Sequence, residues 1–327
     1  MEYWSTIVAI AGINMILALS VYSSFMTGTV SLGQIAFFAI GGFSSASLTV
    51  ILGWHIFPAL LVGAVAAAAG GALIAIPMLR LRGFHLTIAT VAVVEVVRVV
   101  FHNMQYGREG EFALAEGAEM KPWIGPQGPL GFRHISYLTD NDITPLAFAL
   151  WVSLAVALIC LYFHFLERSR LGYAMRAIEE DEVAARSIGL KHNHLKVLAF
   201  TVGAAIAGFG GGLYAHLLTF ITGNDFNIAQ TVIALAYAVI GGGQTFWGPA
   251  LGAFVFTFLP EILRFTKEFR VEIFGGLMLL TMIYRSEGII TKAMVERVGR
   301  ALGSAVGRGA HGQAPLGKSQ EGPAKGS

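Results

Sequence analysis

Two ionisable side chains, Glu95 and Arg98, lie inside an otherwise apolar stretch near residues 83–103. Ionisable residues within a membrane span are candidates for function, because a charge is costly to hold in the bilayer. A carboxylate at Glu95 could carry a proton. The i, i+3 spacing also suits an ion pair on one helix face, with Arg98 extending toward the membrane surface. The spacing favours the structural pair and leaves proton carriage open.

Other groups that could do chemistry are scattered along the chain. Cys160 is the only cysteine, so neither a disulfide framework nor a cysteine metal site is expected. No two of the histidines in apolar stretches are spaced i, i+3 or i, i+4, which argues against a histidine metal site; they are His85, His102, His164 and His216. No apolar stretch gathers the side chains that acid–base or metal chemistry needs. The sequence therefore predicts no catalytic residue, no metal and no cofactor, and disfavours a membrane-embedded enzyme.

Residues 312–319 read GQAPLGKS and satisfy the pattern of a phosphate-binding loop. Such a loop must follow a strand and open a helix. Here Pro315 interrupts it, and only eight residues follow in a polar tail. We therefore expect no nucleotide site on this chain; any ATP would be bound by another chain.

The composition indicates a membrane protein. The chain is 55% hydrophobic and 13% charged, and it holds 40 glycines, whereas a soluble domain has about 25% charged residues. The formal net charge of +2 is too small to argue for nucleic acid, so the expected surroundings are lipid. The N-terminal MEYW lacks the basic region of a signal peptide, and the first apolar segment is expected to be retained.

Apolar stretches long enough to cross a bilayer recur along the chain. Between Glu2 and Arg80 there is no charged residue, and a span needs about 20 apolar residues. We predict an all-α polytopic protein with roughly 8–10 membrane helices, two of them short and separated by GGGQTFWGP at 241–249. The predicted segments are 3–25, 31–52, 57–79, 83–103, 146–166, 197–221, 229–242, 246–263 and 272–286.

The charged segments between these spans set the predicted orientation. Basic residues gather at 80–82, in 167–196 and in the tail, while 104–145 has six acidic and three basic residues. The positive-inside rule then puts the N-terminus and loop 104–145 outside, and 167–196 and the C-terminus in the cytoplasm. The expected organisation is a transmembrane domain over 1–295 and a disordered cytoplasmic tail over 296–327.

A short internal repeat connects two Gly-rich segments. AFFAIGG at 36–42 is similar to AYAVIGG at 236–242, and the predicted topology runs the two copies in opposite directions. Paired Gly-interrupted segments in an inverted repeat indicate a substrate site near the membrane midplane. Small residues also simply allow close helix packing, and that alternative stays open. The candidate pathway residues are Gln34, Gly41, Gly42, Gly241, Gly242 and Gly243.

Uncharged polar residues flank these segments. Gln34 and Gln244 could hydrogen-bond a solute or bridge helices, and the sequence does not separate the two roles. For Asn14, within the first span, we expect a helix-bridging hydrogen bond.

The segment 171–196 predicts two short amphipathic helices at the membrane surface. Leu171, Ala174, Met175 and Ile178 recur at helical spacing and predict one packed face. Glu182 and Arg186 form a favourable i, i+4 pair, and Gly189 suits a left-handed residue that ends a helix. The two helices are expected to join near the acidic cluster 179–182. A solvated loop that only connects two spans is the alternative.

Several stretches of the chain together carry a resemblance to one family. RAIEEDEVAARSIGL at 176–190, followed by KVLAFTVGAAIAGFGGGLYA at 196–215, resembles the cytoplasmic loop of the LivM-type permeases of branched-chain amino acid importers of the ATP-binding cassette class. SLGQIAFFAIGGFSSA at 31–46, LRLRGFHLTIATVAVVEVVR at 79–98 and AVIGGGQTFWGPALGAF at 238–254 are similar to other segments of the family, as are LPEILR at 259–264 and IYRSEGI at 283–289. The likeness covers nearly the whole chain apart from 104–145 and the tail.

The resemblance implies a passive pathway subunit. Two such permeases form the pathway, two cytosolic ATPases drive it, and an external binding protein delivers the solute. It also implies that Glu182, Ala184, Ala185 and Gly189 lie in the loop that docks to an ATPase. The small alanines would allow close approach, and the glycine would turn the chain back to the membrane.

The predicted function is therefore translocation of branched-chain or other small amino acids across the inner membrane. A permease for urea or another small organic solute is an alternative within the same family. An ion-coupled secondary transporter using Glu95 is the alternative outside it. The outer loop, YGREGEFALAEGAEMKPWIGPQGPLG, departs from the family's usual Gly-rich segment, which leaves the solute and the docking of a binding protein undetermined.

Overall fold

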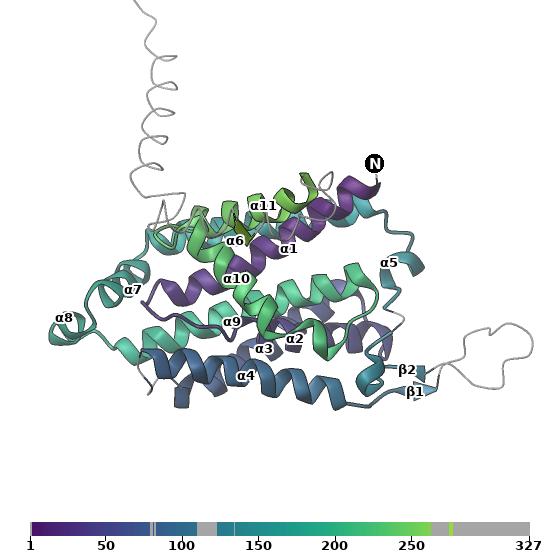
Figure 1. Ribbon diagram of the computed structural model, residues 1–327, viewed down its shortest axis with the longest axis horizontal. Coiled ribbons are helices and arrows are strands. Elements are labelled where there is room, and N and C mark those ends of the chain that lie inside the picture. Colours follow the sequence, from purple (N-terminus) through teal and green to yellow (C-terminus); the bar gives the residue numbers. More distant parts are fainter. Residues whose placement is uncertain are drawn as a thin grey trace, which may run out of the picture.

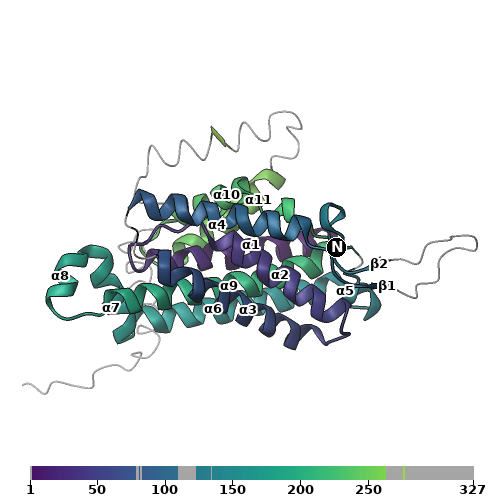
Figure 2. The same cartoon turned by 90° about the horizontal axis from the view of Figure 1, so that it is seen from below.

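The structure is a bundle of long helices that lie side by side (Figure 1). The computed structural model describes residues 2–78, 81, 83–109, 123–133, 135–262 and 275–276. Two short helices, α7 (Arg170–Glu180) and α8 (Glu182–Ser187), project from one end of the bundle (Figure 2). The opposite end carries an antiparallel pair of strands, β1 (Arg108–Glu109) and β2 (Trp123–Ile124). We name these the α7–α8 end and the hairpin end.

Five of the described helices are long and apolar enough to cross a membrane. They are α1 (Glu2–Phe25), α3 (Ile56–Met78), α4 (Phe84–Asn103), α6 (Pro145–Glu167) and α9 (His192–Leu218). Their most apolar windows have a mean hydropathy between 1.6 and 2.5, and a span needs about 20 such residues. The predicted spans over these regions are confirmed, and the chain is an all-α polytopic membrane protein apart from the small hairpin.

The sixth predicted span begins earlier than expected. The sequence predicts it over 197–221, whereas α9 begins at His192 and ends at Leu218. The predicted span begins where the charged residues stop, but the helix begins five residues earlier and includes Lys196. A lysine near the start of a membrane helix is tolerated because its long side chain reaches the polar surface.

Three further helices are shorter: α2 (Gln34–Val50), α10 (Ile228–Gly241) and α11 (Trp247–Ile262). The break predicted at 241–249 is confirmed, since α10 ends at Gly241 and α11 begins at Trp247. Gly242 ends α10 with φ of 108°, a conformation that side chains disfavour. With 14 residues, α10 is about 21 Å long and too short to cross a bilayer alone. The predicted span 272–286, the tail 296–327 and the GQAPLGKS segment fall outside the described residues.

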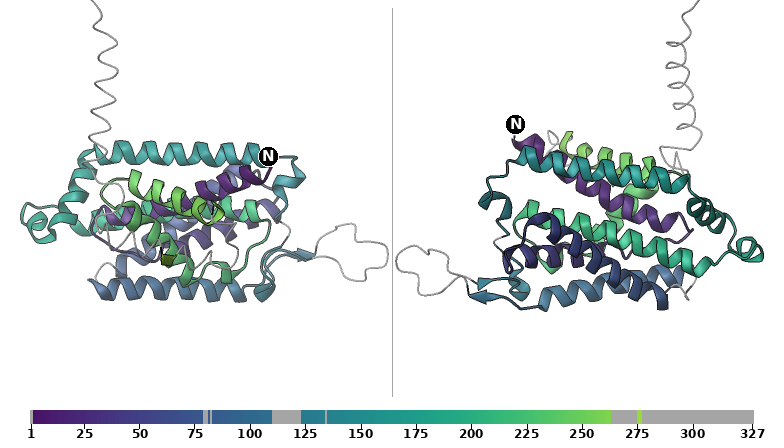
Figure 3. Two further views of the ribbon diagram at one scale, coloured as in Figure 1. Left: turned by 45° about the horizontal axis from the view of Figure 1, so that its top comes forward. Right: turned by 180° about the vertical axis from the view of Figure 1, so that it is seen from behind.

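Successive helices alternate in direction. The N-terminus lies at the hairpin end, and α1 runs toward the α7–α8 end (Figure 3). At the hairpin end, the side chain of Thr49, late in α2, lies 3.1 Å from His216, late in α9. The start of α2 meets the end of α1, because Gln34 Nε2 donates to Ser24 Oγ at 3.0 Å. α2 and α9 thus run together from the α7–α8 end to the hairpin end.

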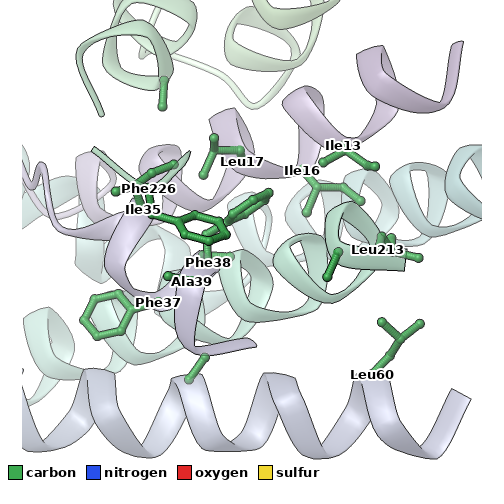
Figure 4. Close-up of a cluster of buried hydrophobic side chains, with 14 of the residues drawn as sticks. Ile13, Ile16, Leu17, Ile35, Phe37, Phe38, Ala39, Leu60, Leu213 and Phe226 are labelled. Carbon is green, nitrogen blue, oxygen red and sulfur yellow. The ribbon is translucent and has the colours of Figure 1, made fainter. Parts of the chain in front are cut away.

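Helix α9 lies at the centre of the bundle and packs on α1, α2 and α3. Figure 4 shows part of the core, in which Phe38 of α2 lies near Leu17 of α1. The rings of Phe37 and Phe38 pack on Phe200 and Tyr214 of α9, with 5.4 Å between the ring centroids in each pair. Around these side chains the helices approach closely at glycines. In lipid, no hydrophobic driving force brings helices together. Small residues stabilise the helix packing instead, because they let the backbones come close enough to gain van der Waals contact.

The predicted outer loop contains more local structure than its composition indicates. Besides the hairpin it forms a 3₁₀ turn, η1 (Gly128–Leu130), and a short helix, α5 (Tyr137–Asp140). Phe132 pairs with Ile221 through backbone hydrogen bonds of 2.7 and 3.1 Å. This pairing joins the loop to the connection between α9 and the 3₁₀ turn η2 (Gly223–Asp225).

Candidate functional site

The helices α7 and α8 each begin at a capping residue that is recognisable in the sequence. Ser169 caps α7 by accepting a hydrogen bond from Gly172 N at 3.1 Å. Asp181 ends α7 and caps α8, accepting from the amides of Val183 and Ala184 at 2.8 and 3.0 Å. An aspartate at this position satisfies amides that a helix start leaves free. The predicted pair of short helices joined within 179–182 is confirmed.

The packed face of α7 differs in part from the prediction. Met175 and Ile178 are buried as expected, but Leu171 is 48% exposed. Gly172 takes its place, because α7 folds back on α6 so closely that a side chain here would overlap the carbonyl oxygen of Leu166. The buried face of α7 therefore consists of residues 172, 175 and 178, because of the turn at Ser169.

Helix α8 presents an apolar surface outside the bundle. Val183 is 74% exposed and Ile188 is 75% exposed. Ala184 is exposed beside Val183, whereas Ala185 faces the protein and is buried. The resemblance pointed to the alanines, and the sequence reasoning missed Val183 and Ile188. Exposed apolar residues on a projecting helix are a feature of surfaces that bind partners.

Glu182 joins α8 to the N-terminal part of α9. Its carboxylate accepts from Arg186 Nη2 at 2.7 Å and from Lys196 Nζ at 2.9 Å, so the predicted Glu182–Arg186 pair is confirmed. The hydrogen bond from Lys196 lowers the pKa of Glu182 below its usual value. Between the two helices Gly189 has φ of 83°, the predicted left-handed conformation. The ion pairs and the glycine together hold α8 in a tight turn.

This corner borders a polar cavity of about 450 Å³. Basic and acidic groups from α8 and α9 form one wall, and the connections between α1 and α2 and between α3 and α4 form the other. Its lining includes Thr29, Leu81, Glu182, Arg186, His192 and Lys196. The cavity opens at the α7–α8 end, next to the projecting helix.

The first Gly-rich segment lies in a helix contact. A methyl group on Gly41 would overlap the backbone of Gly208 in α9, and one on Gly63 of α3 would lie 2.9 Å from the carbonyl oxygen of Gly41. A methyl group on Gly42 would lie 3.1 Å from the carbonyl oxygen of Gly211. This geometry supplies the close packing of α2, α3 and α9. A role of Gly41 and Gly42 in a solute pathway stays a prediction.

The second Gly-rich segment forms the corner between α10 and α11. Side chains at Gly241 or Gly248 would overlap the backbone of the facing segment. A methyl group on Gly243 would lie 3.2 Å from Cδ2 of Phe25, which puts this corner at the α7–α8 end. Because α2 starts at that end and α10 finishes there, the copies 36–42 and 236–242 run in opposite directions, as an inverted repeat requires. The pathway role of Gly241, Gly242 and Gly243 stays a prediction.

The uncharged polar residues have different surroundings. Asn14 Nδ2 donates to Thr257 Oγ1 at 3.0 Å, so the expected bridge joins α1 to α11. Gln34 is buried, and its Oε1 has no hydrogen-bond partner among the described residues. Gln34 lines a very small cavity together with Ser31 and Thr231. The main-chain carbonyl of Gln244 accepts a hydrogen bond from Arg176.

Glu95 and Arg98 form the ion pair that their spacing predicts. Arg98 Nε lies 3.0 Å from both carboxylate oxygens, and Nη1 donates to Asn224 Oδ1 at 2.6 Å. The pair therefore fastens α4 to the turn η2, where Gly223 packs on the Arg98 carbonyl. These contacts favour the structural role.

A cluster that the sequence did not reveal lies where α7 meets the bundle. Arg176 Nη2 donates to Tyr22 Oη at 2.8 Å and to the carbonyl oxygen of Gln244. Glu167 accepts from Tyr22 Oη and, at 3.0 Å, from the amide of Phe246. We name these three side chains, with the Gln244 carbonyl and the Phe246 amide, the Arg176 clamp. Its members come from α1, α6, α7 and the α10–α11 corner, so no local sequence pattern predicts it.

Within the described part of the chain, no group of three or more His, Cys, Asp or Glu side chains lies close enough to hold a metal ion. The arrangement is instead that of a polytopic helical membrane protein with an exposed pair of surface helices at one end. Two sets of polar contacts join this pair to the bundle: the ion pair of Glu182 with Lys196, and the Arg176 clamp.

Comparisons with known proteins identify the family. The family described as "Branched-chain amino acid transport system / permease component" matches residues 3–284. The high-affinity branched-chain amino acid transport system permease protein LivM of Escherichia coli (strain K12) is 32% identical over 287 residues, covering 85% of this chain and 66% of the relative. LivH of the same strain is 26% identical over 160 residues, covering 48% of this chain and 51% of that protein. No solved structure gives a significant match.

The chain belongs to the branched-chain amino acid transport system permease family. It resembles LivM over more of its length than LivH, since the match to LivM covers 85% of this chain. It spans 66% of the length of the LivM relatives that it matches.

Proposed function

We propose that the chain is a pathway-forming permease subunit of an ATP-driven importer for branched-chain or other small amino acids. A second permease, two cytosolic ATPases and an external substrate-binding protein would complete the complex. Family membership supports the transport role, and the relatives' names supply the solute class. In this proposal the chain binds no ATP and catalyses no reaction of its own.

The observation that carries the proposal is the exposed apolar surface of α8. Val183 and Ile188 project from the end of a membrane bundle, on a helix that Glu182 and Gly189 hold in place. A motor protein that docks there would bury both side chains, each contributing about 1.5–3 kcal/mol. We infer that α8 is the ATPase-docking helix, with Ala184 allowing close approach.

The proposed orientation follows from this assignment. The α7–α8 end would face the cytoplasm, and the hairpin end, with the N-terminus and the loop 104–145, would face outward. The membrane would be the inner, or plasma, membrane. Basic residues of 167–196 agree with this orientation under the positive-inside rule.

The test is reconstitution of the chain with a second permease, two ATPases and a substrate-binding protein from the same organism. We expect ATP-driven uptake of leucine into vesicles without an ion gradient. In the double variant Val183→Ala, Ile188→Ala, the ATPases should co-purify at least about tenfold more weakly, because about 1.4 kcal/mol of binding is a factor of ten. Lys191→Gln, an exposed polar change in the same segment, is the matched control and should bind the ATPases normally.

Two results would contradict the proposal. Normal ATPase binding by the double variant would remove α8 as the docking helix. Uptake that needs a proton gradient and ignores ATP would favour an ion-coupled transporter, the hypothesis that Glu95 raised. A complex that carries urea and ignores leucine would instead keep the importer and change the solute.

A further inference from the structure

The Arg176 clamp joins the projecting helices to a corner of the bundle remote in sequence. Arg176 lies in α7, while Gln244 and Phe246 lie between α10 and α11. The guanidinium donates to the carbonyl oxygen of Gln244, and the Glu167 carboxylate accepts from the amide of Phe246 at 3.0 Å. The acid and the base thus hold the main chain on both sides of a single residue, Thr245.

The side chains of the clamp are mutually satisfied and largely buried. Tyr22 is fully buried, and the side chains of Arg176 and Glu167 are 15% and 20% exposed. Arg176 Nη2 lies 3.7 Å from the Glu167 carboxylate, and Tyr22 Oη bonds to both. Hydrogen bonds to charged groups are about twice as strong as neutral ones, and an unpaired buried charge is very costly. The clamp is therefore expected to hold as a unit.

The two sides of the clamp are each rigid. On one side, α7 packs so tightly on the end of α6 that Gly172 admits no side chain against Leu166. On the other side, Gly241 and Gly248 lock α10 against α11. A displacement of α7 would therefore reach α10 and α11 through the clamp.

We propose that the Arg176 clamp is the link by which movement of the α7–α8 segment is passed to the α10–α11 corner. Arg176 and Glu167 act as positioning residues in transport: they bind neither solute nor nucleotide. The inference rests on the proposed function, since it takes the ATPases to be the source of the movement.

The clamp predicts which variants uncouple the complex. Arg176→Gln removes the guanidinium contacts with Tyr22 and the Gln244 carbonyl, and also the ion pair of Arg176 with Glu179 at 3.1 Å. Tyr22→Phe removes one hydroxyl of the clamp, keeps the buried ring and leaves the Glu179 pair in place. Arg176→Lys keeps the charge but cannot reach the phenol and the carbonyl with one planar group. Arg170→Gln, an exposed change on the same helix, is the matched control.

In the reconstituted complex, coupling between sites is usually a 5–150-fold effect. We expect Arg176→Gln to lower leucine transported per ATP hydrolysed about tenfold, at an ATPase rate within about twofold of the unmodified complex. Arg176→Lys should lower transport per ATP in the same way despite its retained charge, and Arg170→Gln should change neither quantity.

Distances between spin labels separate coupling from mere stability. Cys160 is the only cysteine, so a Cys160→Ala background allows labels at exposed positions of α7 (Tyr173), α11 (Val255) and α3 (Leu73). With ATP and vanadate, the α11–α3 distance should shift while the α7–α11 distance stays constant, because the clamp moves both together. In Arg176→Gln and in Tyr22→Phe, the α7–α11 distance should change or broaden, and the α11–α3 shift should shrink.

Two outcomes would overturn the inference: an α7–α11 distance that changes in the unmodified complex as much as α11–α3 does, or clamp variants with unmodified coupling. Absence of any ATP-driven uptake by the unmodified complex would instead refute the proposed function. The two failures are therefore distinguishable.

Discussion

Replacing Gly41 by alanine tests whether the first Gly-rich segment is a packing contact or part of a solute pathway. A methyl group here would overlap the carbonyl oxygen and backbone of Gly208. A carbon and a carbonyl oxygen need roughly 3.3 Å, so α2 and α9 would have to separate by on the order of 1 Å. Backbone atoms cannot rotate away, which sets the cost near 3 kcal/mol, the upper part of the usual range of about 1–3 kcal/mol for overpacking.

Part of this cost is offset, because alanine favours a helix over glycine by about 1 kcal/mol. The net destabilisation is about 2 kcal/mol, or roughly a thirtyfold change in the unfolding equilibrium. The matched control is Gly70→Ala in α3, where the added methyl would make ordinary contact with Ile40 Cδ1 at 3.4 Å. That variant keeps the helix gain without the overlap.

The assay is thermal unfolding of the detergent-solubilised chain, followed by size-exclusion chromatography of the remaining folded fraction. Gly41→Ala should unfold at a clearly lower temperature than the unmodified chain, and Gly70→Ala at the same or a higher temperature. Unchanged stability in Gly41→Ala would refute the close contact of α2 with α9. Unchanged stability together with lost leucine uptake would support the pathway role instead.

Two further predictions concern the α7–α8 end. Gly189→Ala should cost about 1–2 kcal/mol of backbone strain and weaken ATPase binding. The control is Gly53→Ala at the hairpin end, where φ is 68° and the surroundings are equally open; it should cost the same stability and leave ATPase binding unchanged. Equal ATPase binding by both variants would count against the docking role. Because the folded state lowers the pKa of Glu182, its contribution is present above the usual carboxyl pKa and is lost as pH falls through the lowered value. Hydrogen exchange of α8 should therefore accelerate, relative to intrinsic rates, only in acid, and Lys196→Gln should move that change to higher pH; a pH-independent α8 would refute the bond.

The spans could be predicted because the bilayer imposes a length on them. The absence of charge between Glu2 and Arg80 and the glycines at 241–243 mark helices and a break within a few residues. Local chemistry was equally readable at α8: an i, i+4 ion pair from Glu182 and a left-handed Gly189 need no tertiary information. Both features depend on residues that are close together in the sequence.

The rest depends on contacts between distant segments. Tyr22 and Glu167 are separated by 145 positions, and nothing near either residue indicates the other. The same limit applies to Leu171, whose exposure follows from the fold of α7 back onto α6. It also applies to Gly41: the sequence shows a small residue, but only the position of Gly208 shows that the space is already filled.

The glycine contacts divide the described bundle into two tightly packed groups. One consists of α2, α3 and α9, held by Gly41, Gly63 and Gly208. The other is the helix pair α10 and α11, held by Gly241 and Gly248. Separating helices within either group would break backbone contacts that no side-chain movement can restore. Helix α1 packs closely on α9 at Gly203, where a methyl group would lie 2.7 Å from the carbonyl oxygen of Ser20, but it meets α11 mainly through ordinary side chains. A change of shape is therefore least costly between α1 and α11, and the Arg176 clamp lies at the end of that contact proposed to be cytoplasmic, where a docked motor would act on it.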